Sequence, residues 1–195
     1  MSEMKLKFSM EQVLWCQNLI NTEVTRYWRS EAVKQKDLYD KYVLPADLTL
    51  LDKLEIIDFL KLHDNNRPRT LLDVGTGMGH FLTLLKSFHH TSVQGADIKE
   101  ALDYFKLLHR HYGISTIELD IKPQTKFNLS FNYNIITVSN PLFVKGWSAE
   151  DWQFFKDNLL EYITPGGELL IQTSEPTGFT NQLENFRVPS FYFKK

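Results

Sequence analysis

Leu71-Leu72-Asp73-Val74-Gly75-Thr76-Gly77-Met78-Gly79-His80-Phe81 is the stretch that decides the fold of this chain. It predicts a short buried strand that runs into a glycine turn and then into a helix. Glycine has no Cβ, so it turns at positive φ and lets a ligand approach the main chain closely. A tight connection without a ligand is the alternative reading. Three glycines at alternate positions after a carboxylate exceed what such a connection needs, so the stretch predicts a ligand-binding turn.

The sequence after this turn alternates between strands and helices, which is typical of a parallel sheet covered on both faces. We expect strands over 71–74, 92–96, 114–119, 133–138 and 168–173, helices over 81–88 and 100–111, and a further helix after Ser148. Ser148 and Asp151 have capping-box spacing, and Gly113 stands where glycine is favoured after a helix. The chain therefore predicts an α/β fold with a doubly wound, mostly parallel sheet and helices on both faces.

Helical patterns precede the first strand. Ser9 and Gln12 have capping-box spacing before a helix over about 10–21, a second helical stretch covers 23–40, and an amphipathic helix runs from Leu48 to near His63. We divide the chain into an amino-terminal helical cap over 1–45 and a core over 46–195, within one structural domain. After the fifth strand we expect a short helix over 180–187 and one last strand over 188–193.

Composition narrows the function further. The chain has 195 residues, 43% of them hydrophobic, so one core is expected. Its net charge of -2 gives no reason to expect attraction to nucleic acid or anionic membranes. Cys16 is the only cysteine, which fits a reducing compartment. The amino terminus lacks the apolar run of a signal peptide and no segment has membrane-spanning length. We expect a cytoplasmic protein without a metal site.

Polar side chains stand at the ends of four successive expected strands. Asp73 ends the first, Asp97 follows the second, Asp120 follows the third, and Ser139 with Asn140 follows the fourth. Ligands of a doubly wound sheet gather at the carboxyl ends of its strands. Each aspartate alone could be only a turn former or a helix cap. Together they indicate a nucleoside site.

These motifs resemble those of class I S-adenosylmethionine-dependent methyltransferases. The acidic residue and Gly-x-Gly-x-Gly of that family are matched by Asp73 to Gly79, and its turn before the fifth strand is matched by Pro165-Gly166-Gly167. The resemblance covers about residues 50 to 175. It implies that S-adenosylmethionine is bound, that S-adenosylhomocysteine is the product, and that the segment before the core closes over the site. Family sheets usually end in a reversed hairpin, so the resemblance also implies a shortened sheet edge here.

The resemblance also assigns roles to residues of this chain. Asp73 would lie near the amino group of the cofactor's methionine part, and Asp97 would hold the ribose. The remaining cofactor-binding residues would be Gly75, Thr76, Gly77, Gly79, Ile98, Asp120, Ile121 and Ser139. Methyl transfer needs no fixed catalytic residue, because the cofactor carries the activated group. His80 and Asn140 are the candidates on the acceptor side.

The acceptor is expected to be a small molecule. Asn140-Pro141-Leu142-Phe143 distantly resembles the Asn-Pro-Pro-aromatic motif of enzymes that methylate amino groups of nucleic acid bases, but Leu142 replaces the second proline and the chain has no basic surface excess. Nitrogen methylation stays an alternative. An open sheet edge could also be covered by a second copy in a homodimer.

Two other classes of function stay open. A nicotinamide dinucleotide enzyme would prefer Gly-x-Gly-x-x-Gly, and His80 occupies the position of its third glycine. The other alternative is a non-catalytic subunit of the same fold that acts through a protein partner. The aromatic residues of the amino-terminal helices are read either as part of the acceptor pocket or, more commonly, as core packing.

Overall fold

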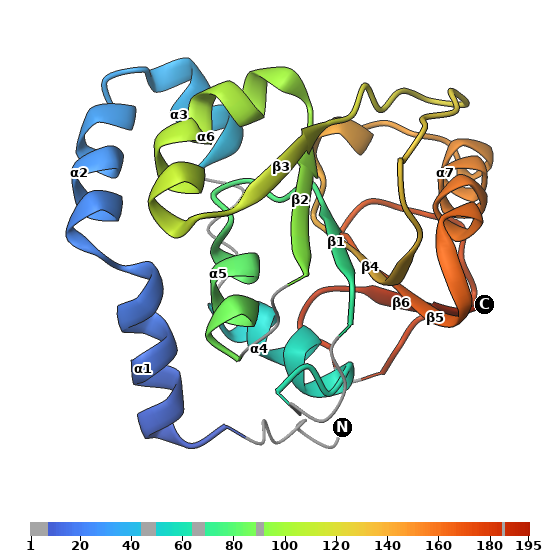
Figure 1. Cartoon of the computed structure of the whole chain (residues 1–195). Coiled ribbons are helices and arrows are strands. Elements are labelled where there is room, and N and C mark those ends of the chain that lie inside the picture. Colours follow the sequence, from blue (N-terminus) through green and yellow to red (C-terminus); the bar gives the residue numbers. More distant parts are fainter. Residues whose placement is uncertain (1–7, 44–49, 64–68, 89–91, 185) are drawn as a thin grey trace.

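One sheet of six strands lies at the centre of the computed structural model, which describes residues 8–43, 50–63, 69–88, 92–184 and 186–195. The strands are β1 (Leu71–Val74), β2 (Val93–Asp97), β3 (Ser115–Glu118), β4 (Tyr133–Ser139), β5 (Ile163–Gln172) and β6 (Ser190–Lys194). Their order is β3-β2-β1-β4-β5-β6, with all pairs parallel except β5 and β6 (Figure 1). The predicted α/β fold with a mostly parallel sheet is confirmed.

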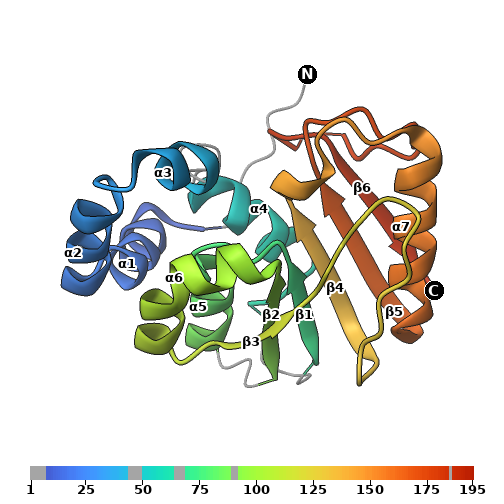
Figure 2. The ribbon, with the colours of Figure 1, turned by 90° about the horizontal axis from the view of Figure 1, so that it is seen from above.

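Helices cover both faces of this sheet. On one face lie α4 (Leu50–Phe59), α5 (His80–Ser87) and α6 (Lys99–Tyr112), and on the other lies α7 (Ala149–Glu161), as Figure 2 shows. Leu71 packs with the α4 and α5 side chains, whereas its neighbour Leu72 packs with Trp152 of α7. Successive residues of a strand point to opposite faces, so β1 is buried on both sides. The predicted capping box of α7 is present in full.

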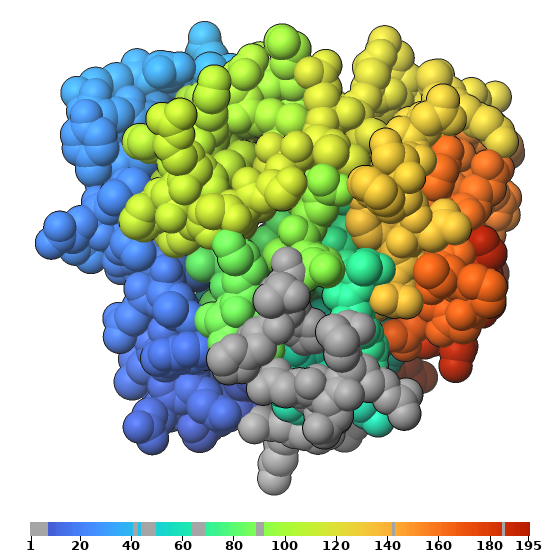
Figure 3. Space-filling model, in the orientation of Figure 1, coloured from blue at the N-terminus to red at the C-terminus, as the bar shows by residue number. Residues whose placement is uncertain are grey.

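The amino-terminal helices form an outer layer against α5 and α6. They are α1 (Met10–Ile20), α2 (Glu23–Ala32) and α3 (Lys36–Tyr42), and their surface is continuous with that of α6 in Figure 3. Cys16 of α1 is fully buried among apolar side chains of α4 and α5. Trp28 of α2 is buried, with its ring centroid 5.3 Å from that of Phe105. The interpretation of these helices as core packing thus holds for Cys16 and Trp28.

The boundaries of two expected helices differ from the structure. The single helix over 23–40 is instead two helices, because the chain tightens after Ala32 into bonds from Lys34 N–H to Glu31 O and from Gln35 N–H to Ala32 O. The next helix, α4, ends at Phe59 rather than near His63, and Lys61 then adopts φ 53°. Its expected start at Leu48 lies outside the described residues.

The fifth strand begins earlier than expected. Ile163 pairs with Tyr133, and Glu168 pairs with Ile135, so the Pro-Gly-Gly turn is a bulge inside β5 and not a turn before it. The backbone of β4 comes very close to this bulge at Gly167. A Cβ on Gly167 would lie 2.7 Å from the Asn134 carbonyl oxygen. Only a residue without a side chain lets the two strands resume their pairing there.

The segment after β5 contains no helix in its described part, so the helix expected over 180–187 is wrong. Its residues instead bond outward: Asn181 Nδ2 donates to the Tyr192 carbonyl over 2.7 Å, and Arg187 Nε lies 3.1 Å from Glu55 Oε1 of α4. The one expected last strand is present as β6, antiparallel to β5. No helix among the described residues is both long and apolar enough to cross a membrane.

The bulge in β5 provides a stability test. We expect Gly167→Ala to lower the free energy of unfolding by about 3 kcal/mol, because its methyl group overlaps the backbone of β4. The matched control is Gly166→Ala, at φ 77° with open space around it, where backbone strain alone costs about 1 kcal/mol. Urea unfolding of both variants measures the difference. Equal losses would show that close packing does not select the second glycine.

Candidate functional site

A pocket of about 760 Å³, including its open mouth, lies at the carboxyl ends of the central strands. Strand β1 pairs with β2 on one side and β4 on the other, and the chain leaves β1 toward β2 before it returns to β4. Open α/β sheets bind ligands at this kind of reversal, since loops from neighbouring strands diverge there.

The glycine turn forms one wall of this pocket. Gly75, Gly77 and Gly79 have φ of 78°, 49° and 78°, which non-glycine residues rarely adopt. The N–H groups of Gly75 and Thr76 both donate to the Ala96 carbonyl, over 2.8 and 3.2 Å. These bonds fasten the start of the turn to β2. The predicted conformational reason for glycine at these positions is confirmed.

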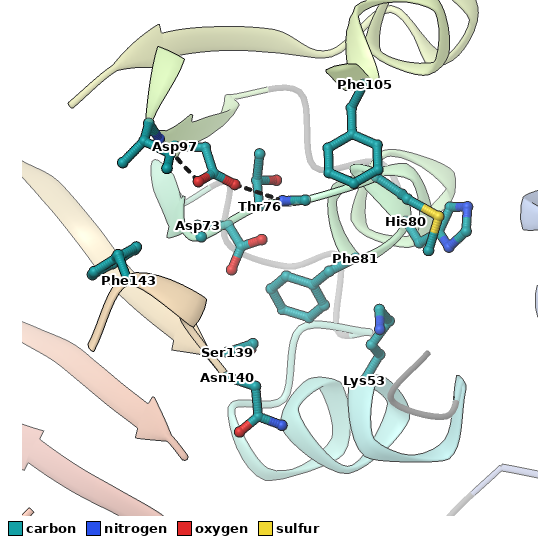
Figure 4. A pocket seen from close by; sticks show the side chains of 14 residues that line it. Lys53, Asp73, Thr76, His80, Phe81, Asp97, Phe105, Ser139, Asn140 and Phe143 are labelled. Carbon is teal, nitrogen blue, oxygen red and sulfur yellow. Dashed lines mark hydrogen bonds between the residues drawn. The ribbon is translucent and has the colours of Figure 1, made fainter. Parts of the chain in front are cut away.

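Two carboxyl groups are buried at this wall, as Figure 4 shows. Asp97 at the end of β2 accepts Gly77 N–H over 3.0 Å and Ile98 N–H over 2.9 Å. Burial raises the pKa of Asp97 to about 6, against the lowering effect of these two bonds. Asp73 at β1 accepts the Thr137 hydroxyl over 2.8 Å, and burial raises the pKa of Asp73 to about 7.

Carboxyl groups in this state favour a particular kind of ligand. A buried carboxylate gains most from a cation or from hydroxyl donors that replace lost water. Ser139 Oγ and His80 Nε2 are also buried at the pocket, and neither has a hydrogen-bond partner among the residues that the structure describes. Unpaired buried polar atoms are rare in folded proteins unless water or a ligand satisfies them. The pocket therefore suits a polar ligand with a positive charge and hydroxyl groups.

His80 is a weak base in this environment. Burial, together with the positive charges of Lys53 and Arg29, lowers the pKa of His80 to about 3. An imidazole that stays neutral over the physiological range accepts a hydrogen bond, but it takes up a proton poorly. The prediction of His80 as an acceptor-side residue stays untested, and these surroundings favour a hydrogen-bonding role over general-base catalysis.

Most of the predicted site residues converge on this pocket. It is lined by Asp73, Gly75, Thr76, Gly77, His80, Asp97, Ile98, Ser139 and Asn140. Asn140 has φ 43°, a left-handed conformation that turns its backbone sharply after β4. Side chains that were not predicted also line it: Lys53, Met78, Phe81, Phe105 and Phe143. Met78 and Phe81 lie within the stretch 71–81 and Phe143 within the motif at 140–143, whereas Lys53 and Phe105 lie outside any motif. Only the packed structure identifies those two.

Three predicted cofactor residues lie elsewhere. Asp120 is exposed in the segment after β3 and pairs with Lys122 Nζ over 2.7 Å. Ile121 packs in the core on the α7 side of the sheet. A Cβ on Gly79 would lie 2.8 Å from Ile114 Cδ1, so helix packing explains this glycine without a ligand. Their cofactor contacts stay predictions that this arrangement does not favour.

The amino-terminal helices approach the pocket without lining it. None of the described residues of α1 to α3 is among those that line it. Their contact with the pocket is indirect, since Trp28 packs on Phe105, which does line the pocket. The division into a cap over 1–45 and a core over 46–195 stays a proposal.

No protein-family model matches this chain, and no curated protein matches its sequence. Solved structures do match. The sugar N-methyltransferase KedS8 from Streptoalloteichus sp has a TM-score of 0.55 at 17% identity, over 74% of this chain and 57% of that one. TrmN from Thermus thermophilus has 0.55 at 18%, over 80% and 52%. CalS10, an amino pentose methyltransferase from Micromonospora echinaspora, has 0.50 at 16%, over 93% and 64%.

These likenesses establish the fold. The chain has the class I S-adenosylmethionine-dependent methyltransferase fold, as the resemblance of its motifs implied. It spans between about half and two thirds of the length of the three solved structures. Fold alone does not identify an activity, which has to be argued from the site.

The raised pKa of Asp73 predicts a pH-dependent stability gain on its removal. Folding holds a proton on Asp73 that the unfolded chain releases near its ordinary pKa of 3.8, so this residue costs stability as pH rises from about 4 to about 7. Asp73→Asn keeps an acceptor for Thr137 and has no proton to lose. We expect its advantage over the wild type to grow across that range to ~4 kcal/mol at pH 8.

Urea unfolding at several pH values measures this difference, with Asp103→Asn as the control at an exposed position of α6. The control should show no such growth. A gap between Asp73→Asn and wild type that is the same at pH 4.5 and pH 8 would contradict the buried, protonated state of Asp73.

Proposed function

We propose that this protein binds S-adenosylmethionine in the pocket at the glycine turn and transfers its methyl group to a small-molecule acceptor. The observation that carries the proposal is the pair of buried carboxyl groups, Asp73 and Asp97, beside a turn of three positive-φ glycines. The cofactor has an ammonium group and two ribose hydroxyls, which can replace the water that burial removes from these carboxyl groups. The class I methyltransferase fold supports the same ligand.

Each pocket residue can be given a role in binding. Asp73 would hold the ammonium group, Asp97 would accept from the ribose hydroxyls, and Ile98 with Phe105 would pack on the adenine. The glycine turn would let the ligand approach the main chain. Ser139 Oγ, which has no partner within the described residues, would bond to the ligand or the acceptor.

The chemistry asked of the protein is modest. The bound cofactor supplies an activated methyl group, and the protein has to align the acceptor and exclude water. Phe81 and Phe143 provide apolar walls for the exclusion of water. Asn140 carries an amide that can orient the acceptor by hydrogen bonding. His80 stays neutral at physiological pH, so we assign it to hydrogen bonding and not to proton removal.

The acceptor class rests on weaker support. Two of the matched structures are described as a sugar N-methyltransferase and an amino pentose methyltransferase. A net charge of -2 gives this chain no general attraction to polynucleotides. We therefore propose a small polar acceptor, with the methylated atom left to experiment.

Calorimetry with S-adenosylhomocysteine, beside NAD, tests the proposal. We expect S-adenosylhomocysteine to bind and NAD to bind weakly or not at all. The affinity for S-adenosylhomocysteine should rise between pH 5.5 and pH 8. The reason is that an ammonium group binds ionised Asp73, whose pKa is raised to about 7 in the free protein. Binding near pH 6.5 should release protons, which titrations in buffers of different ionisation enthalpy detect. Asp73→Asn should abolish most of that release and weaken binding about tenfold or more.

Preferential binding of NAD would overturn the methyltransferase assignment. Binding of S-adenosylhomocysteine with no pH dependence would retain the cofactor and remove Asp73 from its ammonium site. Binding without turnover over a broad screen of acceptors would favour the non-catalytic subunit.

Asn140 offers a test of the acceptor side. Because Asn140 has φ 43°, Asn140→Gly removes the amide without straining the backbone. We expect cofactor affinity to stay within about twofold of wild type while turnover falls about tenfold or more. Isothermal titration and a methyl-transfer assay on the same preparation measure the two. Parallel losses of affinity and turnover would instead assign Asn140 to the structure of the loop.

A further inference from the structure

The last turn of α6 lies against the glycine turn, through a histidine that the motifs do not include. His109 is buried, and its Nε2 lies 2.7 Å from the Gly77 carbonyl oxygen. A carbonyl oxygen only accepts, so Nε2 must carry the hydrogen. Burial lowers the pKa of His109, which favours the neutral ring with its single N–H on Nε2 over the charged form.

This bond completes a clamp on Gly77. The N–H of Gly77 donates to Asp97 Oδ2 over 3.0 Å, while its carbonyl accepts from His109. Both peptide groups that flank this residue are therefore fixed, one by β2 and one by α6. The middle of a turn that faces a ligand gains a defined orientation in this way.

Packing does not provide that orientation at Gly77. Apart from the chain neighbours of Gly77, a Cβ placed there would meet one atom of the described residues within 4 Å, the Gly75 carbonyl oxygen at 4.0 Å. At Gly75, by comparison, the Cβ would already contact Pro141 at 3.5 Å. The positive φ of Gly77 is thus held by hydrogen bonds, and His109 supplies one of the two side-chain partners.

The ring of His109 reaches this position because Gly79 has no side chain. A Cβ on Gly79 would lie 3.3 Å from His109 Cδ2. On the next turn of α6, the Tyr112 hydroxyl donates to the Ile20 carbonyl over 2.8 Å, and so ties the helix to α1. The histidine therefore sits on a helix that is held from outside as well as from the sheet.

We propose that His109 is a positioning residue that holds the glycine turn in its ligand-binding shape through the Gly77 carbonyl. The clamp itself is independent of ligand identity, whereas its effect on cofactor affinity rests on the proposed function. Without the N–H of His109, the Gly77 carbonyl would lose this partner and the turn would sample other conformations.

A matched pair of substitutions isolates the hydrogen bond. His109→Gln keeps an N–H donor on a flexible side chain. The methionine of His109→Met has nearly the same shape as that glutamine but carries no donor. We expect His109→Met to speed amide hydrogen exchange of the peptide over 75–79 by about tenfold and to weaken S-adenosylhomocysteine about tenfold. His109→Gln should stay within about threefold of wild type in both. The same two changes at His111, exposed on the same helix, are the control.

The outcomes separate this inference from the proposed function. If glutamine and methionine behave alike, the ring acts by packing and the proposal fails; unchanged exchange at 75–79 in His109→Met has the same meaning. If the wild type does not bind S-adenosylhomocysteine, the proposed function fails while the exchange data still decide the clamp.

One measurement on the wild type covers the case in which the variants do not fold. Long-range ¹H–¹⁵N spectra identify which ring nitrogen of His109 carries the hydrogen. A proton on Nε2 is expected, and a ring protonated only at Nδ1 would overturn the clamp, because that nitrogen could not donate to Gly77.

Discussion

The constraint on which the site depends is the burial of two carboxyl groups at neighbouring strand ends. Asp73 and Asp97 face the same pocket because β1 and β2 are parallel and adjacent, so their carboxyl ends meet at one edge. Burial raises the pKa of both groups, which makes their ionisation costly in the free protein. Such a cost is recovered only when a ligand supplies the missing charge or donors. The two carboxyl groups thus lower the stability of the free protein at the position where this fold presents ligands, and the proposed ligand would offset that loss.

The glycines of the turn serve three separate physical purposes. Gly75 supplies a positive φ at the start of the turn, Gly77 is turned by hydrogen bonds from both sides, and Gly79 makes room for α6 and Ile114. Only the first two line the pocket. A motif that looks uniform in sequence therefore combines ligand access with the packing of helix on strand. This division explains why Gly79 is needed although it does not itself line the pocket.

The amino-terminal helices support the site from behind. They pack on α5 and α6, and Trp28 contacts the back of Phe105, whose ring lines the pocket. The positive charge of Arg29 on α2 contributes to the low pKa of His80. These helices therefore influence the shape and electrostatics of the pocket through intervening side chains. Their described residues do not form its wall, which distinguishes this arrangement from a lid seated directly on a ligand.

The sequence by itself determined the order of strands and helices, the glycine turn and the carboxylates at the ends of β1 and β2, because hydrophobic periodicity, capping and positive φ are local properties of residues. It predicted a cofactor contact for Asp120, which is exposed after β3 and whose contact stays a prediction. It also predicted a helix over 180–187 where the chain instead bonds to β6 and α4. Lys53, Phe105 and His109 were also missed, since nothing in their local sequence shows what they face. Only the tertiary structure brings α4 and α6 against the turn, because contacts between distant segments depend on how the helices pack.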